Sequence, residues 1–268
     1  MSRLTACFAA LKASGTKALI PYIVAGDPTP EITVDVLHAL VAAGSNVLEV
    51  GVPFSDPMAD GPTITLGHER ALTHHVSLRD VLKMVTEFRR KDSQTPIVLM
   101  GYLNPVEAMG YATFADACAE AGVDGVLTVD MPPEEADELM AEYKRVGIDP
   151  IYLLAPTTTM ARAARITAAA SGYVYYVSLN GVTGSAALDV GAVSARIAQL
   201  RTLTQLPIGV GFGIKDAESA AAVARVADGV VVGSVLVQRM GELAATPQQI
   251  PAAVANILAP LRAAIDQA

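Results

Sequence analysis

Three carboxylates lie close together in the segment NVLEVGVPFSDPMADGPT, which runs from Asn46 to Thr63. Glu49 falls inside an apolar run of the kind that is buried in a parallel sheet, and Asp56 and Asp60 follow in a loop rich in proline and glycine. Burial raises the pKa of a carboxyl group, which suits proton transfer near neutral pH. The segment therefore indicates acid–base catalysis by Glu49, with Asp60 as the better-placed second carboxylate. A structural buried glutamate and ordinary turn aspartates are the alternatives.

Two glycine-rich segments further along the chain indicate a phosphate site. LPIGVGFGIKDAES contains Gly213, and DGVVVGSVLV contains Gly233 and Ser234; each segment joins an apolar run to a helical pattern. Backbone N–H groups at helix N-termini bind phosphate. The glycine spacing does not fit a dinucleotide-binding fingerprint, because the third glycine of GxGxxG is misplaced. Glycines that serve only tight turns are the alternative.

A third glycine-containing segment, SLNGVTGSA, offers Gly181, Thr183 and Gly184 as further donors or as part of a lid. Apolar and aromatic residues end most of the expected strands: Tyr22, Met100, Leu127, Val129, Leu153, Tyr175 and Phe212. Core packing explains most of these residues. If they line the site, they fit a flat apolar group beside a phosphate tail.

The positions of lysine, histidine and cysteine argue against several chemistries. None of the lysines falls in an expected strand, so Schiff-base aldolase chemistry lacks its residue. The histidines (His38, His68, His74 and His75) and the cysteines (Cys7 and Cys118) fall in expected helices or their connections. A metal cluster is therefore not expected at the strand ends. The remaining chemistry is carboxylate acid–base work, without a cofactor, on a phosphorylated and partly apolar substrate.

Alternating strands and helices must position these residues. The expected strands are Ala18–Val24, Val47–Val50, Ile97–Gly101, Gly125–Val129, Pro150–Leu154, Tyr173–Val177, Ile208–Gly211 and Gly229–Val232. The expected helices are Glu31–Ala43, Ile64–Thr73 with Leu78–Arg90, Tyr111–Ala121, Glu134–Val146, Met160–Ala169, Ala192–Thr202, Ala217–Val226 and Gln249–Ile265.

Eight such strand–helix units predict one α/β domain over residues 1–268, a closed (β/α)8 TIM barrel with an extra N-terminal helix. A doubly wound sheet is the alternative. In a barrel the site lies at the C-terminal ends of the strands, with phosphate bound after strands seven and eight. Side chains alternate along a strand, so Val47, Glu49 and Gly51 share one face. If that face is the interior, the Glu49 carboxylate points into the mouth of the barrel.

The composition limits which partners and which location in the cell are expected for this chain. The chain has 268 residues, of which 52% are hydrophobic and 17% charged, with a net charge of -8. These values allow a large core, and without a basic stripe they argue against nucleic acid as a partner. No apolar run approaches the length of a membrane span. Two cysteines suggest free thiols in a reducing compartment, so a cytoplasmic location is expected.

Five blocks of the sequence, in this order, resemble the tryptophan synthase alpha subunit family: LEVGVPFSDPMADGPTI, MGYLNP, DMPPEEA, GVTG and GFGI. The first block is highly specific, and the resemblance covers essentially the whole chain. It implies retro-aldol cleavage of indole-3-glycerol phosphate to indole and glyceraldehyde 3-phosphate. It also implies that Glu49 is the acid–base group, and that Asp60 holds the indole N–H and stabilises positive charge on the ring.

The same resemblance assigns binding roles. It matches Gly184, Gly213, Gly233 and Ser234 to phosphate-binding positions, and Tyr175 and Thr183 to substrate-site positions. The strand-end residues Tyr22, Met100, Leu127 and Phe212 are expected to bind the substrate beside them. Family members pass indole to a beta subunit in an α2β2 assembly, where pyridoxal phosphate belongs to the beta subunit. The loop of Pro53, Asp56 and Pro57 resembles the segment that faces this partner.

Two other functions stay open on the residues alone. A phosphosugar isomerase or epimerase on the same barrel shares the phosphate loops, although a histidine, cysteine or metal set at the strand ends is more typical of it. A non-catalytic subunit that only binds phosphate ligands is the second. Substitution of Glu49 separates this binding subunit from a lyase.

Overall fold

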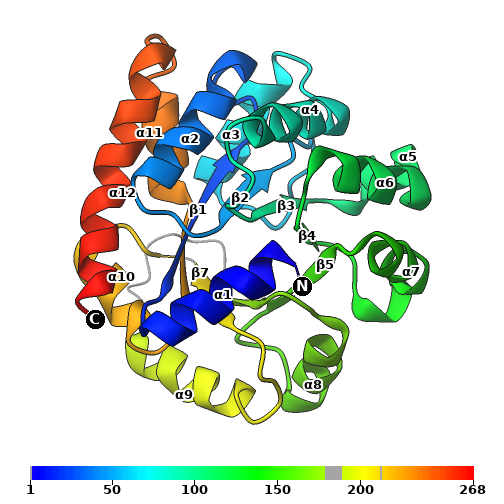
Figure 1. The fold of residues 1–268 in the computed structure, drawn as a ribbon, viewed down its shortest axis with the longest axis vertical. Coiled ribbons are helices and arrows are strands. Elements are labelled where there is room, and N and C mark those ends of the chain that lie inside the picture. Colours follow the sequence, from blue (N-terminus) through cyan, green and yellow to red (C-terminus); the bar gives the residue numbers. More distant parts are fainter. Residues whose placement is uncertain (1, 179–188, 212) are drawn as a thin grey trace.

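Eight parallel strands pair in sequence order and close into a barrel, with β1 beside β8 (Figure 1). The structure is a computed structural model that describes residues 2–178, 189–211 and 213–268. The strands are β1 (Ala18–Val24), β2 (Leu48–Gly51), β3 (Ile97–Gly101), β4 (Gly125–Thr128), β5 (Asp149–Leu154), β6 (Val174–Val177), β7 (Ile208–Gly211) and β8 (Gly229–Val232). The predicted (β/α)8 barrel is confirmed, and the closing β1–β8 pair rules out a doubly wound sheet.

Helices surround the barrel. They are α1 (Arg3–Ser14), α2 (Thr33–Ala42), α3 (Pro62–Leu72), α4 (Leu78–Arg89), α5 (Leu103–Met109), α6 (Tyr111–Ala121), α7 (Asp137–Val146), α8 (Met160–Ala169), α9 (Val190–Leu200), α10 (Ala217–Ala224), α11 (Ser234–Glu242) and α12 (Ile250–Asp266). Short 3-10 turns lie at η1 (Pro30–Ile32), η2 (Pro133–Glu135) and η3 (Pro247–Gln249). The extra N-terminal helix is present as predicted.

Helix α5 was not predicted from the sequence. Its first turn contains Asn104 and Pro105, a pair that is typical of a turn. Proline is nevertheless tolerated in the first turn of a helix, because the N–H groups there have no partner within the helix. The helix predicted from Glu134 also begins later, because η2 comes first and α7 starts at Asp137.

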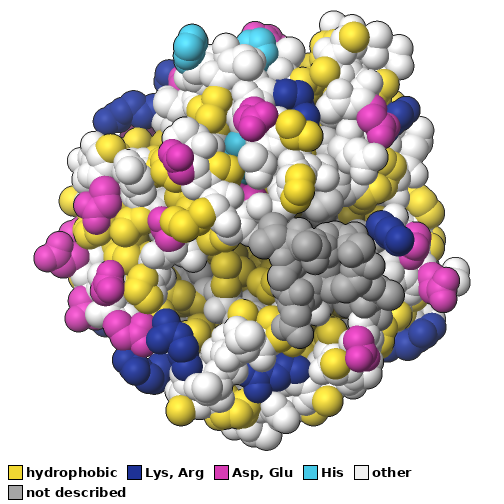
Figure 2. Space-filling view, turned by 180° about the vertical axis from the view of Figure 1, so that it is seen from behind, with side chains coloured by type: hydrophobic (Ala, Val, Ile, Leu, Met, Phe, Trp, Pro, Cys, Tyr) yellow, Lys and Arg dark blue, Asp and Glu magenta, His cyan; other side chains and the backbone are white. Residues whose placement is uncertain are grey.

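Side-chain alternation along the strands divides the apolar residues into two layers. Leu48 and Val50 of β2 belong to the large core between the barrel and the helices. Val47 belongs to the barrel interior, as do Leu4, Phe8, Ala18, Ile20, Val98, Leu127, Ile151, Tyr173, Tyr175 and Val231. Glu49 has the same parity as Val47, so it faces the interior as predicted. The face opposite α1 is hollowed near its centre, and apolar side chains lie in the hollow (Figure 2).

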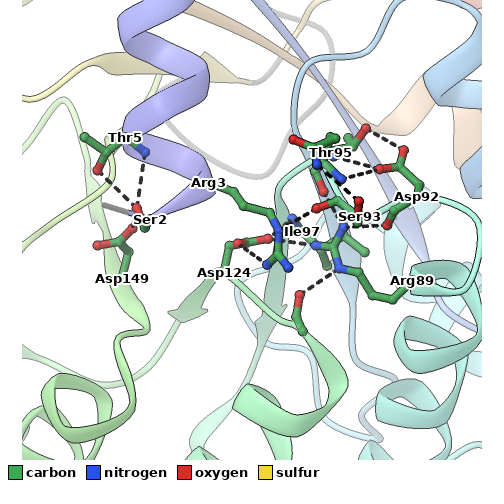
Figure 3. A network of polar contacts seen from close by, with 12 residues as sticks. Ser2, Arg3, Thr5, Arg89, Asp92, Ser93, Thr95, Ile97, Asp124 and Asp149 are labelled. Atoms are coloured by element: carbon green, nitrogen blue, oxygen red, sulfur yellow. Dashed lines mark hydrogen bonds and ion pairs between the residues drawn. The ribbon is translucent and has the colours of Figure 1, made fainter.

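Helix α1 covers the other end of the barrel (Figure 1). Its Leu4 and Phe8 are buried among the interior side chains. Its first residue, Arg3, pairs with Asp124 at 2.9 Å, and the same carboxylate pairs with Arg89 of α4 at 2.8 Å (Figure 3). Asp124 also accepts the backbone N–H of Ile97 at 2.8 Å. These contacts fix α1 to the N-terminal ends of β3 and β4, and they leave the C-terminal ends of the strands for a site.

Candidate active site

Strand β2 holds Glu49 inside the barrel, where the residue is 1% exposed. Burial raises the pKa of Glu49 to about 7, and a hydrogen bond from the Tyr173 hydroxyl to Oε1 partly opposes this shift. The second carboxyl oxygen, Oε2, is buried without a hydrogen-bond partner in the described part of the chain. Glu49 can therefore give or take a proton near neutral pH, and the hydrogen-bonding capacity of its second oxygen is unused in the described part of the chain.

Asp60 lies in the loop between β2 and α3 and is held by side chains from elsewhere in the sequence. The Tyr102 hydroxyl, which follows β3, donates to Asp60 Oδ2 at 2.9 Å and accepts the Ala59 N–H at 3.0 Å. His68 Nε2 lies 3.4 Å from the same oxygen. Sequence reasoning named neither Tyr102 nor Tyr173 as a site residue, and it placed His68 away from the strand ends.

Two buried tyrosines, Tyr22 and Tyr175, interact electrostatically with both predicted catalytic carboxylates. Tyr22 of β1 and Tyr175 of β6 were both predicted as substrate-binding residues, and both are buried. Burial raises the pKa of Tyr22 well above its usual value, and the charges of Asp60 and Glu49 raise it further. Burial, Glu49 and Asp60 raise the pKa of Tyr175 in the same direction. Both hydroxyls therefore lie within electrostatic reach of the two predicted catalytic residues.

Glycines in neighbouring strands make room for these hydroxyls. A Cβ atom at Gly51 of β2 would lie 2.3 Å from the Tyr22 hydroxyl oxygen. A Cβ atom at Gly211 of β7 would clash with the Tyr175 hydroxyl in the same way. Any larger residue at either position would displace a tyrosine from the barrel mouth.

A cavity of about 570 Å³ opens at the C-terminal ends of β3 to β6. The predicted residues that line it are Asp60, Met100, Val129, Leu153 and Tyr175. This wall is mainly apolar, and the volume is in the range of small-molecule sites. Glu49 itself does not line the cavity, and Leu127 is fully buried in the barrel interior.

The two predicted phosphate loops differ in how their helices begin. Asp216 caps α10 with its own side chain, which accepts the Ser219 N–H at 2.8 Å. No side chain caps α11, whose Ser234 is exposed at its first position. The first backbone bonds at that end come from Leu236 and Val237 to the Gly233 carbonyl. The α11 N-terminus therefore keeps N–H groups available to an anion.

Gly213, the third predicted phosphate residue in the described chain, has a positive φ of 79° and is exposed. Thr183, Gly184 and Phe212, which were predicted for the same site, lie outside the described residues. The phosphate prediction therefore stays a prediction, supported by the uncapped α11 and the open Gly213 turn.

The loop predicted to face a partner begins directly after β2. Pro53 is buried, whereas Asp56 is exposed and Pro57 is partly exposed. Met58 in the same loop is 75% exposed, and Leu66 of α3 is 52% exposed. Among the described residues these two are the large hydrophobic side chains that remain in solvent, and Met58 belongs to the predicted partner loop itself.

The described residues contain no group of three or more histidine, cysteine, aspartate or glutamate side chains placed to hold a metal ion. Cys7 and Cys118 are both free thiols. In the ranges that the structure describes, no helix has the length and apolar character needed to cross a membrane.

Comparison with known proteins explains why these features occur together. Residues 8–266 match the family described as tryptophan synthase alpha chain. This chain belongs to that family. The resemblance seen in the sequence is therefore confirmed, and membership makes this alpha chain an enzyme of tryptophan synthesis.

Individual alpha chains match along their whole length. The tryptophan synthase alpha chain of Thioalkalivibrio sulfidiphilus is 60% identical over 266 residues, which cover 99% of this chain and 100% of that protein. The crystal structure of the alpha subunit from Legionella pneumophila superposes with a TM-score of 0.93 at 45% identity, and both chains are fully covered. A chain of the tryptophan synthase complex from Pyrococcus furiosus superposes with a TM-score of 0.82 at 35% identity, with 92% of this chain and 98% of that chain covered.

Proposed function

We propose that this alpha chain is a carbon–carbon lyase that cleaves indole-3-glycerol phosphate into indole and glyceraldehyde 3-phosphate. The observation that carries the proposal is Glu49, a buried carboxyl group with a pKa of about 7 and one free oxygen, at the barrel mouth near a mainly apolar cavity. A retro-aldol cleavage of this substrate needs a proton donor at a ring carbon, a base for a hydroxyl proton and a counter-charge for the ring.

Glu49 can perform both proton transfers in turn. Protonated Glu49 gives its proton to C3 of the indole ring, which places a positive charge on the ring nitrogen. The resulting carboxylate takes the proton of the side-chain hydroxyl next to the bond that breaks. The carbon–carbon bond then cleaves, its electrons return to the ring, and the hydroxyl carbon leaves as the aldehyde. Glu49 ends the cycle protonated, as it began.

Asp60 supplies the counter-charge in this proposal. Tyr102 holds Oδ2 of the carboxylate, so Oδ1 is left to face the indole N–H. Negative charge at this point stabilises the cationic ring more strongly than the neutral substrate, which lowers the barrier.

The rest of the substrate has matching surfaces. We assign the ring to the cavity that Met100 and Tyr175 line, with Tyr22, Leu127, Thr183 and Phe212 as the other predicted substrate-binding residues. We assign the phosphate to Gly184, Gly213, Gly233 and Ser234. The apolar wall of the cavity and the free N–H groups at the α11 N-terminus support these two assignments.

We propose a beta subunit as the partner, in an α2β2 assembly that passes indole between the subunits. The exposed Met58 beside Asp56 and Pro57 supports this docking surface. Pyridoxal phosphate belongs to the beta subunit in this proposal and no cofactor to this chain, since none of its lysines lies on a described strand. The free cysteines support a cytoplasmic location.

The test is indole release by the purified chain from indole-3-glycerol phosphate, with and without an active beta subunit. Glu49→Gln should lower kcat on the order of 10²-fold or more, because general acid–base groups contribute roughly 10² to 10⁴. Glu120→Gln, which changes an exposed glutamate on α6, is the matched control and should behave as the unsubstituted chain. Near-normal turnover by Glu49→Gln would refute the assignment of Glu49, and no indole from any form would refute the reaction.

A further inference from the structure

His68 lies on α3 and is 2% exposed, yet its imidazole contacts the loop that carries Asp60 on both sides. Nδ1 accepts the backbone N–H of Phe54 at 3.2 Å. Nε2 lies 3.4 Å from Asp60 Oδ2 and has no hydrogen bond of ordinary geometry within the described chain. Hydrogen bonds at catalytic groups are often long before substrate binds and shorten in the complex.

The Phe54 contact fixes the tautomer of His68. A backbone N–H can only donate, so Nδ1 must be an unprotonated acceptor. The proton of the neutral ring is therefore on Nε2, which faces the carboxylate. A doubly protonated ring would set an N–H at Nδ1 against the N–H of Phe54, so the neutral form fits this site.

Asp60 Oδ2 thus accepts one formed hydrogen bond, from Tyr102, and has a second possible donor, His68 Nε2, within 3.4 Å. The Tyr102 hydroxyl and His68 Nε2 both approach Oδ2. The other charged groups near the imidazole are Asp27 and its partner Arg70, which form a bidentate ion pair beside α3. That pair is complete without His68, so the imidazole N–H is left for Asp60.

We propose that His68 is a positioning residue for the cleavage reaction: its Nε2–H holds Asp60 Oδ2 so that Oδ1 faces the indole N–H. This inference rests on the proposed function. Without this donor Tyr102 alone holds Oδ2, so the carboxylate can turn further about its terminal torsion and the counter-charge is less firmly fixed where positive charge develops.

Two amide substitutions distinguish a role of His68 in positioning Asp60 from a role in supporting the loop at Phe54. His68→Gln keeps a donor at the place of Nε2 but loses the acceptor for Phe54. His68→Asn keeps an acceptor at the place of Nδ1 but cannot reach Asp60. If His68 positions Asp60, then His68→Asn lowers kcat by about ten- to a hundred-fold with little change in KM, whereas His68→Gln stays near the unsubstituted rate. If His68 only supports the loop, this order is reversed, and the proposal is wrong.

Nitrogen NMR of the imidazoles tests the same contact without any assay of turnover. The chain has four histidines, and each can be assigned by a single substitution. We expect Nδ1 of His68 to be unprotonated and its proton to be on Nε2, and Asp60→Asn to shift the Nε2 resonance while leaving Nδ1 nearly unchanged. Asp56→Asn, an exposed aspartate in the same loop, is the control and should shift neither.

The outcomes distinguish this inference from the function on which it rests. An unsubstituted chain that releases no indole refutes the proposed reaction, and the NMR result alone then decides whether His68 holds Asp60. A proton on Nδ1, or an Nε2 resonance that ignores Asp60→Asn, refutes the positioning role even if the chain is an active lyase. Thermal unfolding of each variant identifies any that loses activity because it no longer folds.

Discussion

The Tyr173 hydroxyl donates to Glu49 Oε1, while Oε2 of the same carboxyl group has no hydrogen-bond partner in the described chain. One oxygen is thus fixed and the other is free. Burial raises the pKa of Glu49 and the Tyr173 bond lowers it, so the value of about 7 reflects both. This balance keeps both protonation states accessible near neutral pH, which a residue that acts first as acid and then as base requires.

Removal of the Tyr173 hydroxyl should move the pH profile. Tyr173→Phe takes away the bond that favours the charged form, so the pKa of Glu49 rises. Since the proposed reaction begins with protonated Glu49, the fall of kcat/KM at high pH should shift upward by the same amount. Tyr176→Phe is the control, because Tyr176 lies in β6, which follows Tyr173 directly, and its ring belongs to the outer core. An unshifted profile in Tyr173→Phe would contradict the assigned acid.

Glu49 should also reduce stability at high pH. Its pKa rises from an ordinary value of 4.5 to about 7 in the folded chain, so the folded state binds this proton more tightly than the unfolded state. The contribution of Glu49 to the free energy of unfolding is fully present below pH 4.5 and is lost as the pH rises through 7. Glu49→Gln should therefore be more stable than the unsubstituted chain by about 3 kcal/mol at pH 8, but not at pH 4. Urea unfolding at the two pH values measures this difference, and a gain independent of pH would contradict it.

Gly51→Ala should displace the Tyr22 side chain at the mouth of the barrel. The added Cβ atom would lie 2.3 Å from the Tyr22 hydroxyl oxygen, so Tyr22 must move. We expect a loss of about 1–3 kcal/mol in the free energy of unfolding and a lower kcat/KM. Gly191→Ala in α9, where the nearest atom is 3.3 Å from the new Cβ, is the control. Equal effects of the two substitutions would argue against the close packing of Tyr22 over Gly51.

Asp124→Ala should destabilise the chain without changing the chemistry. It leaves Arg3, Arg89 and the Ile97 N–H without their buried acceptor, and removal of one partner from a buried ion pair costs about 3–5 kcal/mol. The kcat of the folded fraction should not change, because Asp124 lies at the opposite end of the barrel from the site. Asp116→Ala, which breaks an exposed ion pair with Arg145, is the control and should have little effect. A changed kcat at full folding would contradict this separation.

The barrel itself could be predicted because its signals are local. Apolar runs located the strands to within one or two residues, and alternation placed Glu49 on the same face as Val47, which the structure shows to be the interior face. The surroundings of Asp60 could not be predicted in the same way. His68 and Tyr102 are 8 and 42 residues from Asp60 in sequence and meet it only after the barrel closes. In the sequence, Tyr173 cannot be told from other aromatic residues of the apolar runs. Its contact with Glu49 forms only when both side chains face the interior of the closed barrel.

The contacts of α1 also constrain the order in which the chain can fold. This helix leaves the ribosome before the residues that it contacts, because Ser2 bonds to Asp149 and Arg3 pairs with Asp124. At 5–20 residues per second, α1 therefore waits on the order of 10 s for its binding surface to be synthesised. During that time Leu4 and Phe8 have no barrel to enter. Helix α1 is therefore made well before the surface that buries it, and its apolar side chains stay exposed until that surface has formed.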